Sequence, residues 1–309
     1  MNVLHSIAEL NRVPGPLFLA IGVFDGVHLG HEAVIRRALN DAQIGHGTAV
    51  VVTFDPHPAR VLRPQQAPRL LTSTVHKVRL IKALGIEYLL TVPFDATFAE
   101  TPATRFIRQL VAAAHPLREI CVGYEWCFGR GREGNLELLR TLGDEMGFDE
   151  VGVQAVQVDG TIVSSTLIRA AVEVGDLSGA ARLLGRPYSI LGTVVKGDQL
   201  GRKLGFPTAN LSAHSEQFPP NGVYAVEAEW RDERLKGVVN IGVRPTIENA
   251  GGQRVLELHL FDFDRDVYGE DIEVTFRSFI RGEKKFAGLD ELKAQIARDA
   301  KAAQVMLEG

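Results

Sequence analysis

The chain has 309 residues, of which 45% are hydrophobic and 23% are charged, and its formal net charge is −4. This length allows two domains with separate cores, and the composition is that of a globular protein. The charge balance gives no reason to expect a nucleic-acid partner, and no apolar segment is long enough to predict a membrane span.

Short apolar runs alternate with helical patterns over the first 185 residues. Residues 17–21 form a continuous apolar run, typical of a strand covered on both faces, and a helix with apolar residues on one face follows a turn at 22–26. Further strands are predicted at 49–54, 87–92, 120–124 and 151–158, and further helices at 74–84, 101–114 and 136–146. Thr101 is expected to cap the helix at 101–114, with Pro102 in its first turn. The alternation predicts a doubly wound parallel α/β domain, whose ligands bind beyond the carboxyl ends of the strands.

From about residue 188 the pattern changes to strands without helices between them. They are predicted at 194–195, 223–230, 238–241, 255–261 and 272–276, with Gly and Pro in the connections. This predicts an antiparallel barrel or sandwich, followed by one amphipathic helix at 289–307. The change of period near residues 185–187 places the domain boundary there, giving domains 1–185 and 186–309. No internal repeat is present.

Two features indicate the cellular compartment. The N-terminus has no basic stretch followed by an apolar run, so we expect no signal peptide. Cys121 and Cys127 flank one strand and predict neither a disulfide framework nor a zinc site. We therefore expect a cytoplasmic protein with reduced thiols.

Two histidines, His28 and His31, lie between the first strand and the first helix, with Gly30 between them. A helix N-terminus offers free N–H groups to a phosphate, and imidazoles donate hydrogen bonds to phosphate oxygens as charge develops. Gly30 lets a nucleotide approach the backbone closely. The alternatives are polar residues on an exposed loop or a zinc site, but no third ligand lies nearby in the sequence.

This pattern resembles the HxGH signature of the nucleotidyltransferase superfamily. Together, residues 22–31 and 53–58 resemble the bacterial bifunctional riboflavin kinase/FAD synthetase (FMN adenylyltransferase) family. The resemblance implies catalytic roles for His28 and His31. It also implies nucleotide or phosphate contacts at Gly22, Phe24, Asp25 and Gly30, and flavin contacts at Asp55 and His57.

Two later segments of the first domain also resemble family elements. Residues 163–169 match a second phosphate-binding signature of the family. Hydroxyls at a helix start and an arginine can bind phosphate oxygens. An ordinary helix cap with a surface arginine is the alternative. The phosphate ligands implied there are Ser164, Ser165, Thr166 and Arg169. The glycine-rich loop at 122–135 is implied to hold nucleotide and flavin, although Glu125 and Trp126 depart from the usual residues; Glu125 can still accept a hydrogen bond and Trp126 can still stack.

Residues 201–210, GRKLGFPTAN, contain neither a P-loop nor a protein-kinase glycine loop. They match the GRxLGxPTAN signature of riboflavin kinases. Glycines allow the backbone to wrap phosphates, and Thr208 and Asn210 are oxygen donors suited to Mg²⁺. The phosphate-binding residues implied here are Gly201, Lys203, Gly205 and Pro207. A glycine-rich barrel loop without function is the alternative.

Kinase chemistry also requires a group that accepts the proton of the riboflavin hydroxyl. Residues 256–260 alternate, which places Glu257 and His259 on the face opposite the leucines. The family resemblance assigns the base to Glu257, and a solvent-facing carboxylate is the alternative. Arg281, in another family-like stretch, is a candidate contact to the flavin or to a nucleotide phosphate, or equally a surface charge.

The resemblance covers nearly the whole chain and implies two activities. They are ATP-dependent phosphorylation of riboflavin to FMN and adenylyl transfer from ATP to FMN, giving FAD and pyrophosphate, with Mg²⁺ as the metal cofactor. Riboflavin, FMN and ATP are the expected partners, without nucleic acid or membrane, and the oligomeric state is left open. The alternatives are a single-activity enzyme with one silent domain, or a flavin carrier without catalysis. Intact motifs at both sites favour the bifunctional enzyme.

Overall fold

The structure, a computed structural model, describes residues 1–196, 205–244 and 253–308. The chain divides into two compact units, one made of residues 1–68 and 77–165, the other of residues 69–76 and 166–309. The boundary between residues 185 and 186 as the limit of the two activities stays a prediction. Within the described ranges, no helix combines the length and the apolar character that crossing a membrane requires.

The first unit contains the predicted parallel sheet, with strand order β1-β4-β3-β2-β5-β6. All of its strand pairs are parallel. The strands are β1 (Asn2–Leu4), β2 (Leu17–Ile21), β3 (Thr48–Asp55), β4 (Tyr88–Pro93), β5 (Leu117–Gly123) and β6 (Asp149–Val153). From β2 the chain adds strands on one side up to β4, and then returns to place β5 on the other side of β2. The switch point between β2 and β5 is where a sheet of this kind binds its ligand.

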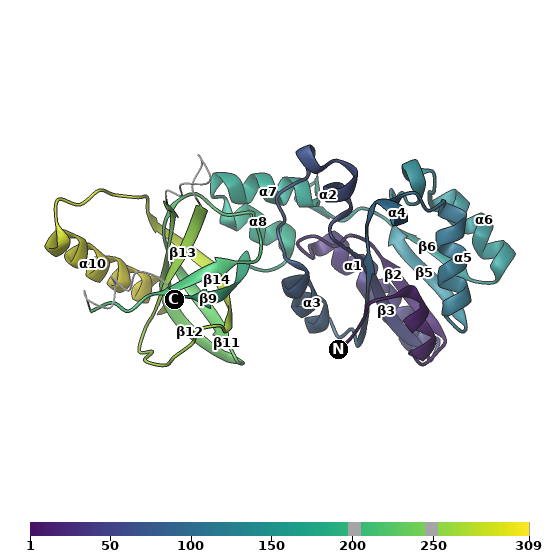
Figure 1. Cartoon of the computed structure of the whole chain (residues 1–309), viewed down its shortest axis with the longest axis horizontal. Helices are drawn as coiled ribbons and strands as arrows, with labels where there is room; N and C mark the ends of the chain where they lie inside the picture. The colour runs from purple at the N-terminus through teal and green to yellow at the C-terminus, as the bar shows by residue number, and fades with distance from the viewer. Residues whose placement is uncertain (197–204, 245–252, 309) are drawn as a thin grey trace. The chain divides into compact units, whose positions relative to one another are not determined.

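Both faces of this sheet are buried, as the continuous apolar runs predict. Alternate residues of β2 enter two separate cores: Leu19 packs with residues of α5 and α6, whereas Ala20 packs with residues of α1 and α3. Figure 1 shows the helices on either side of the strands. The helices of the first 165 residues are η1 (Ile7–Arg12), α1 (Leu29–Ile44), α2 (Pro58–Leu62), η2 (Pro64–Gln66), α3 (Thr74–Ala83), α4 (Ala96–Ala99), α5 (Ala103–Ala113), η3 (Arg130–Arg132) and α6 (Leu136–Met146).

Two local expectations were wrong. The predicted strand 151–158 is two strands: β6 ends at Val153, while β7 (Gln157–Val158) pairs with β8 (Thr161–Ile162) in a separate ribbon. An apolar run does not reveal where the chain leaves the sheet. Pro102, rather than Thr101, is the N-cap of α5, and the first N–H of the helix, that of Ala103, donates to the Glu133 carboxylate at 2.9 Å.

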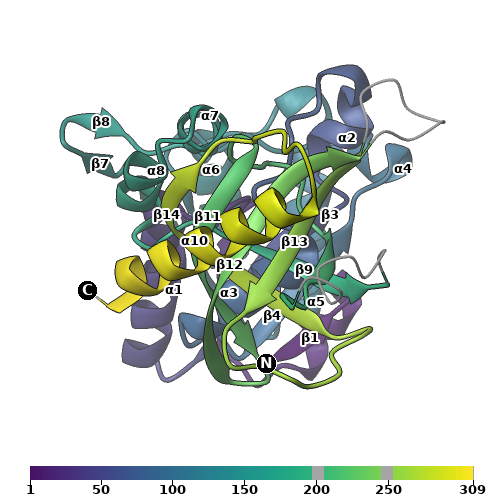
Figure 2. The same ribbon diagram turned by 90° about the vertical axis from the view of Figure 1, so that its left-hand side faces the viewer.

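The second unit contains a closed antiparallel barrel, which decides between the predicted barrel and sandwich. Its strand order is β10-β13-β12-β11-β14-β9. The strands are β9 (Ser189–Val195), β10 (Ala209–Ala213), β11 (Gly222–Trp230), β12 (Glu233–Arg244), β13 (Gln253–Leu260) and β14 (Asp271–Arg281); the helices are α7 (Ser165–Val174), α8 (Leu177–Leu184) and α10 (Leu289–Glu308). Helix α10 packs against β11, β12 and β14, and Figure 2 shows it lying across the barrel. The terminal helix was predicted from its amphipathic pattern, and it packs against one side of the barrel.

Candidate active sites

The turn from β2 into α1 brings His28 and His31 together. His28 is the N-cap of α1, and its Nδ1 accepts the backbone N–H of His31 at 3.3 Å; Nδ1 of His31 accepts the backbone N–H of His28 at 3.4 Å. The two rings are stacked with centroids 3.5 Å apart. Because each Nδ1 is an acceptor, each neutral ring carries its proton on Nε2. The capping pattern therefore gives this helix end two imidazole N–H donors.

The glycines of this turn make room for aromatic rings. A Cβ at Gly30 would lie 3.2 Å from the His28 ring, and one at Gly22 would lie 2.8 Å from the Phe24 ring. The absence of a side chain at Gly30 therefore leaves room for the stacked histidine pair, a role that the sequence did not indicate. Asp25, like His28, is buried. The predicted nucleotide-binding residues at positions 22–31 thus lie in one compact turn.

Sequence reasoning missed one buried residue that contacts this turn. Lys77, in α3, is only 4% exposed, and its Nζ donates to the Val23 carbonyl at 2.8 Å and to Thr53 Oγ1 at 3.3 Å. Burial lowers the pKa of Lys77 to about 8, against the attraction of Asp25 and Asp55. A single lysine in an amphipathic pattern carries no signal of burial, because its partners are 24 and 54 residues away.

A cavity of about 520 Å³ lies beside the turn in the first unit. Its lining is mostly apolar and aromatic, and two arginines contribute charge. The lining residues are Val23, Phe54, His57, Pro58, Ala59, Leu62, Arg63, Phe94, Phe98, Ala99, Thr101, Phe106, Trp126, Cys127, Phe128, Gly129, Gly131 and Arg132. Trp126 stacks on Phe128 with ring centroids 4.4 Å apart. A flat aromatic ligand with an anionic tail suits this lining.

The four flavin ligands predicted in this unit do not all line the cavity. His57 and Trp126 line the cavity, whereas Asp55 and Glu125 are exposed and are not among its lining residues. His57 also caps α2, because its Nδ1 accepts the N–H of Ala59 at 3.1 Å. The cavity thus brings together two of the four flavin ligands predicted in this unit.

The serine-rich element begins α7 and contacts the turn through Ser165. Ser165 Oγ donates to the Asp25 carbonyl at 2.9 Å. Thr166 and Arg169 fall in the second unit, where Arg169 Nε donates to the carbonyl of Arg69 at 2.8 Å. Ser164 is half-buried. The phosphate-binding roles of these four residues stay predictions.

In the second unit, strand register aligns the predicted kinase residues. Asn210 of β10 pairs with Glu257 of β13, which in turn pairs with Asn240 of β12. Directly paired residues share a face, and Leu256 and Leu258 occupy the buried opposite face. The alternation expected for this strand is therefore confirmed, and an amide, a carboxylate and a second amide lie in one row.

The segment before β10 contacts strand β13. His259 Nδ1 lies 2.8 Å from the Pro207 carbonyl, and its ring contacts Phe206 edge-on. Pro207 and Thr208 line a cavity of about 420 Å³ formed also by β13 and residues 263–268. Gly205 has φ +86°. Gly201 and Lys203, the other two predicted phosphate ligands of this motif, lie outside the described residues.

The donor set of this strand row suits a hard cation. The Thr208 hydroxyl, the Asn210 amide oxygen and the Glu257 carboxylate are oxygen donors on adjoining segments, and Mg²⁺ prefers oxygen ligands. Among the His, Cys, Asp and Glu side chains of the described residues, one group, Asp41, Glu119 and Cys121, has ligand atoms that all lie within 4.8 Å of one another. These three side chains already have polar partners: Asp41 pairs with Arg37, and the Cys121 thiol donates to Glu119.

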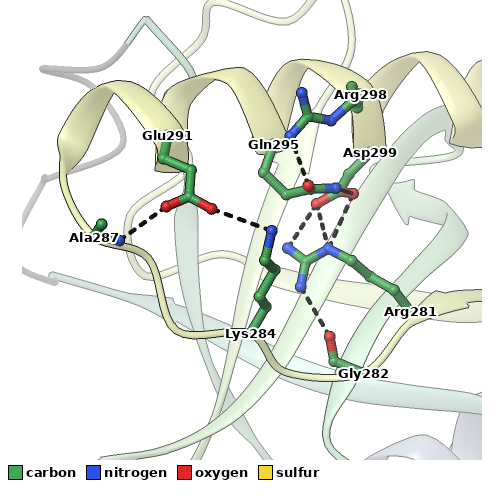
Figure 3. A network of polar contacts seen from close by, with 8 residues as sticks. All are labelled: Arg281, Gly282, Lys284, Ala287, Glu291, Gln295, Arg298 and Asp299. Carbon is green, nitrogen blue, oxygen red and sulfur yellow. Dashed lines mark hydrogen bonds and ion pairs between the residues drawn. The ribbon is translucent and has the colours of Figure 1, made fainter.

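Arg281 is engaged in the fold of the second unit. Its Nε and Nη2 donate to the carboxylate of Asp299 in α10, and its Nη1 donates to the Gly282 carbonyl (Figure 3). Gln295 donates to the same carboxylate at 2.8 Å. This network joins β14 to α10, so the guanidinium has a structural use in addition to its predicted flavin contact.

The family models and the curated relatives that match this chain agree with each other. The riboflavin kinase family model matches residues 184–307, and the FAD synthetase model matches residues 11–167. Curated proteins called bifunctional riboflavin kinase/FMN adenylyltransferase are similar throughout: that of Escherichia coli K12 is 42% identical over 98% of this chain and 97% of its own length, and that of Bacillus subtilis is 38% identical over 98% and 96%. A crystal structure described as a macrolide-efflux protein from Streptococcus pneumoniae matches with TM-score 0.82 and 29% identity, covering 98% of this chain and 99% of that chain.

Proposed function

The chain belongs to the family of bifunctional riboflavin kinases/FMN adenylyltransferases, and we propose that adenylyl transfer runs at His28 and His31 and phosphoryl transfer at Asn210 and Glu257. The chain phosphorylates riboflavin to FMN and adenylylates FMN to FAD, each time with ATP. The residue roles and the division of labour between residues 1–185 and 186–309 are our proposal. The observation that carries it is the stacked histidine pair, whose two Nδ1 atoms accept backbone N–H groups.

Adenylyl transfer requires positioning and charge stabilisation rather than a base. The FMN phosphate is already an anion, so its oxygen attacks the α-phosphorus of ATP directly and the bond to pyrophosphate breaks. Negative charge grows on the phosphate oxygens, where the Nε2–H groups of His28 and His31 and the N-terminus of α1 stabilise it. The aromatic cavity containing Trp126 supports a flavin ring beside this helix end.

Phosphoryl transfer requires a proton acceptor in addition. The riboflavin hydroxyl attacks the γ-phosphorus, its proton passes to the Glu257 carboxylate, and ADP leaves. We propose that Thr208 and Asn210 hold Mg²⁺, which neutralises charge on the ATP phosphates when bound. The pairing of Asn210 with Glu257 supports this role, because it brings the metal ligand and the base to one face of the barrel wall.

We propose that the enzyme works in the cytosol on small molecules only. The free thiols of Cys121 and Cys127 are compatible with a reducing compartment, and the net charge of −4 offers no attraction for a polynucleotide.

Purified protein incubated with riboflavin, ATP and Mg²⁺ tests the proposal when the flavins are resolved by chromatography. FMN should form first and FAD second, and both should stop when Mg²⁺ is chelated. FMN alone, or FAD made only from supplied FMN, would indicate a single-activity enzyme. If a folded sample forms no product, the remaining interpretation is a flavin carrier without catalysis.

A further inference from the structure

A buried ammonium group supports the turn that carries the histidine pair. The Val23 carbonyl accepts two hydrogen bonds, one from Lys77 Nζ at 2.8 Å and one from Thr53 Oγ1 at 3.0 Å. Lys77 Nζ also donates to Thr53 Oγ1, so the three groups form a closed triangle. Thr53 is fully buried and Lys77 is nearly so. The amino group therefore acts on a backbone atom of the turn and not on solvent.

The turn needs such support because its backbone is strained. Phe24, Gly26 and Val27 have φ angles of +53°, +87° and +41°. Non-glycine residues, and β-branched valine above all, hold such angles only where the surroundings enforce them. The residue preceding this segment is Val23, the acceptor of the Lys77 bond, and His28 follows it directly. A shift of the Val23 carbonyl would therefore propagate into the N-cap of α1.

The charge of Lys77 is retained at neutral pH despite its burial. Burial disfavours the ammonium form and lowers the pKa of Lys77 to about 8, while the carboxylates of Asp25 and Asp55 attract the charge and oppose this effect. Asp25 lies in the turn itself and Asp55 ends β3, so the charges that face the ammonium come from both segments to which it is hydrogen-bonded. The group is a cation at pH 7 and loses its charge as the pH rises above 8.

We propose that Lys77 is a positioning residue for adenylyl transfer, which holds the strained turn so that it presents His28 and His31 to ATP. The inference rests on the proposed assignment of this reaction to the first unit. Lys77 does not line the cavity, whereas Val23 does, so the lysine acts through the backbone of the turn and touches no substrate. Its loss should lower kcat for FAD formation more than it raises KM, because the reacting groups are misplaced while the aromatic cavity is kept.

Lys77→Met, which keeps the length and removes the charge, provides the first test, and Lys82→Met on the exposed face of α3 is the matched control. We expect Lys77→Met to lower kcat for FMN adenylylation about 10²-fold, since misplacement by about 1 Å can cost this much, with riboflavin phosphorylation within twofold of the original chain. Lys82→Met should leave both activities unchanged. Unchanged adenylylation in Lys77→Met would refute the positioning role.

The pH profile separates positioning from simple structural support. The original chain should lose adenylylation activity as the pH rises above 8, because the ammonium loses its proton. Lys77→Arg keeps a permanent charge, so whatever activity it has should persist at pH 9. A profile of Lys77→Arg with the same alkaline decline as the original chain would contradict the inference.

Two further outcomes keep the test decisive. If Lys77→Met fails to fold, the isosteric Thr53→Val removes one partner of the ammonium and the second donor to Val23; we expect roughly a tenfold lower adenylylation rate, equivalent to about 1.4 kcal/mol, and an unchanged rate would refute the inference. If the original chain itself makes FMN but no FAD, the proposed function fails for this unit and the inference fails with it. If the original chain makes FAD and all variants at positions 53 and 77 match it, only the inference fails.

Discussion

Asn210 and Glu257 lie directly opposite each other on the antiparallel strands β10 and β13. Paired positions share a face and lie close enough for their side chains to meet one ligand. An amide oxygen for a metal and a carboxylate for a proton are therefore brought together by strand register alone. The kinase assignment depends on this relationship.

Replacing Glu257 by Gln should remove the proton acceptor while keeping the size of the side chain. We expect riboflavin phosphorylation to fall about 10²- to 10⁴-fold, the usual contribution of a general base, with adenylylation of supplied FMN unchanged. Initial rates from chromatographic separation of the flavins measure both activities. Glu229→Gln, an exposed carboxylate on β11, is the control and should retain both. Full kinase activity in Glu257→Gln would exclude Glu257 as the base.

His28 has two functions in the structure, and two variants separate them. His28→Ala removes both the imidazole and the helix cap, which should cost about 1 kcal/mol of stability. His28→Asn keeps a cap acceptor for the His31 N–H but removes the imidazole ring, with its stacking on His31 and its Nε2–H donor. Both variants should make FMN normally and lose FAD formation by about 10²- to 10³-fold, as for loss of a transition-state donor. Restoration of FAD synthesis in His28→Asn would show that capping alone matters.

Trp126 should contribute to FMN binding through its stack with Phe128 in the aromatic cavity. Trp126→Ala removes one face of that cavity, and we expect KM for FMN to rise about tenfold, which corresponds to about 1.4 kcal/mol. Steady-state adenylylation kinetics measure the change. Tyr124→Ala, an exposed residue in the same loop that does not line the cavity, is the comparison. An equal effect at both positions would argue for a general disturbance of the loop.

A buried carboxyl in the first unit predicts a pH-dependent stability. Burial raises the pKa of Glu119 from 4.5 to about 7; the Cys121 thiol and Arg37 oppose the rise, and Asp41 adds to it. The folded state therefore holds this proton more tightly than the unfolded chain, so the stability that it contributes is lost as the pH rises from 4.5 to about 7.

Glu119→Gln mimics the protonated form at every pH. We expect its melting temperature to exceed that of the original chain by about 2–4 °C at pH 8, where ~1 kcal/mol shifts a domain of this size by that amount. The difference should vanish towards pH 5. Thermal unfolding across pH 5–8 measures it, with the exposed Glu145→Gln as control. A constant difference at all pH values would contradict a titrating Glu119.

The sequence predicted the local patterns of this protein better than its long-range contacts. Apolar runs predicted five of the six parallel strands and missed the short edge strand β1, and the alternation around Glu257 predicted the face on which it lies. Strand β10 was not predicted, because residues 209–213 read as the end of a glycine-rich motif. Strand β9 was reduced to residues 194–195, although it begins at Ser189, because its first residues follow the expected boundary.

The candidate sites show the same division. His28 and His31 are close in sequence, so their spacing already predicted a shared helix end. Lys77 was missed because its hydrogen bonds to Val23 and Thr53 depend on how α3 packs. Arg281 could be interpreted as a ligand contact or a surface charge, since its partner Asp299 lies 18 residues away on a helix whose packing the sequence does not fix.

Replacing Arg281 tests whether this residue stabilises the fold or binds flavin, because the two roles predict different effects on the melting temperature and on KM. Asp299 is 4% exposed, so Arg281→Ala would leave a buried carboxylate whose one other hydrogen-bond partner among the described residues is Gln295. Breaking a buried ion pair from one side costs about 3–5 kcal/mol, and we expect a clear fall in the melting temperature. Arg281→Ala combined with Asp299→Ala should recover part of the loss, because the unpaired charge is gone.

The double substitution gives the coupling between the two residues directly, provided each single variant removes the interaction without creating another. Riboflavin KM should stay within about threefold in Arg281→Ala at a temperature where it is folded, a change below ~0.7 kcal/mol. Arg281→Ala with unaltered melting behaviour but a KM raised tenfold or more would assign the guanidinium to the flavin instead. Because both readouts come from the same purified variant, one preparation shows whether Arg281 contributes through the network of Figure 3, through a ligand contact, or through both.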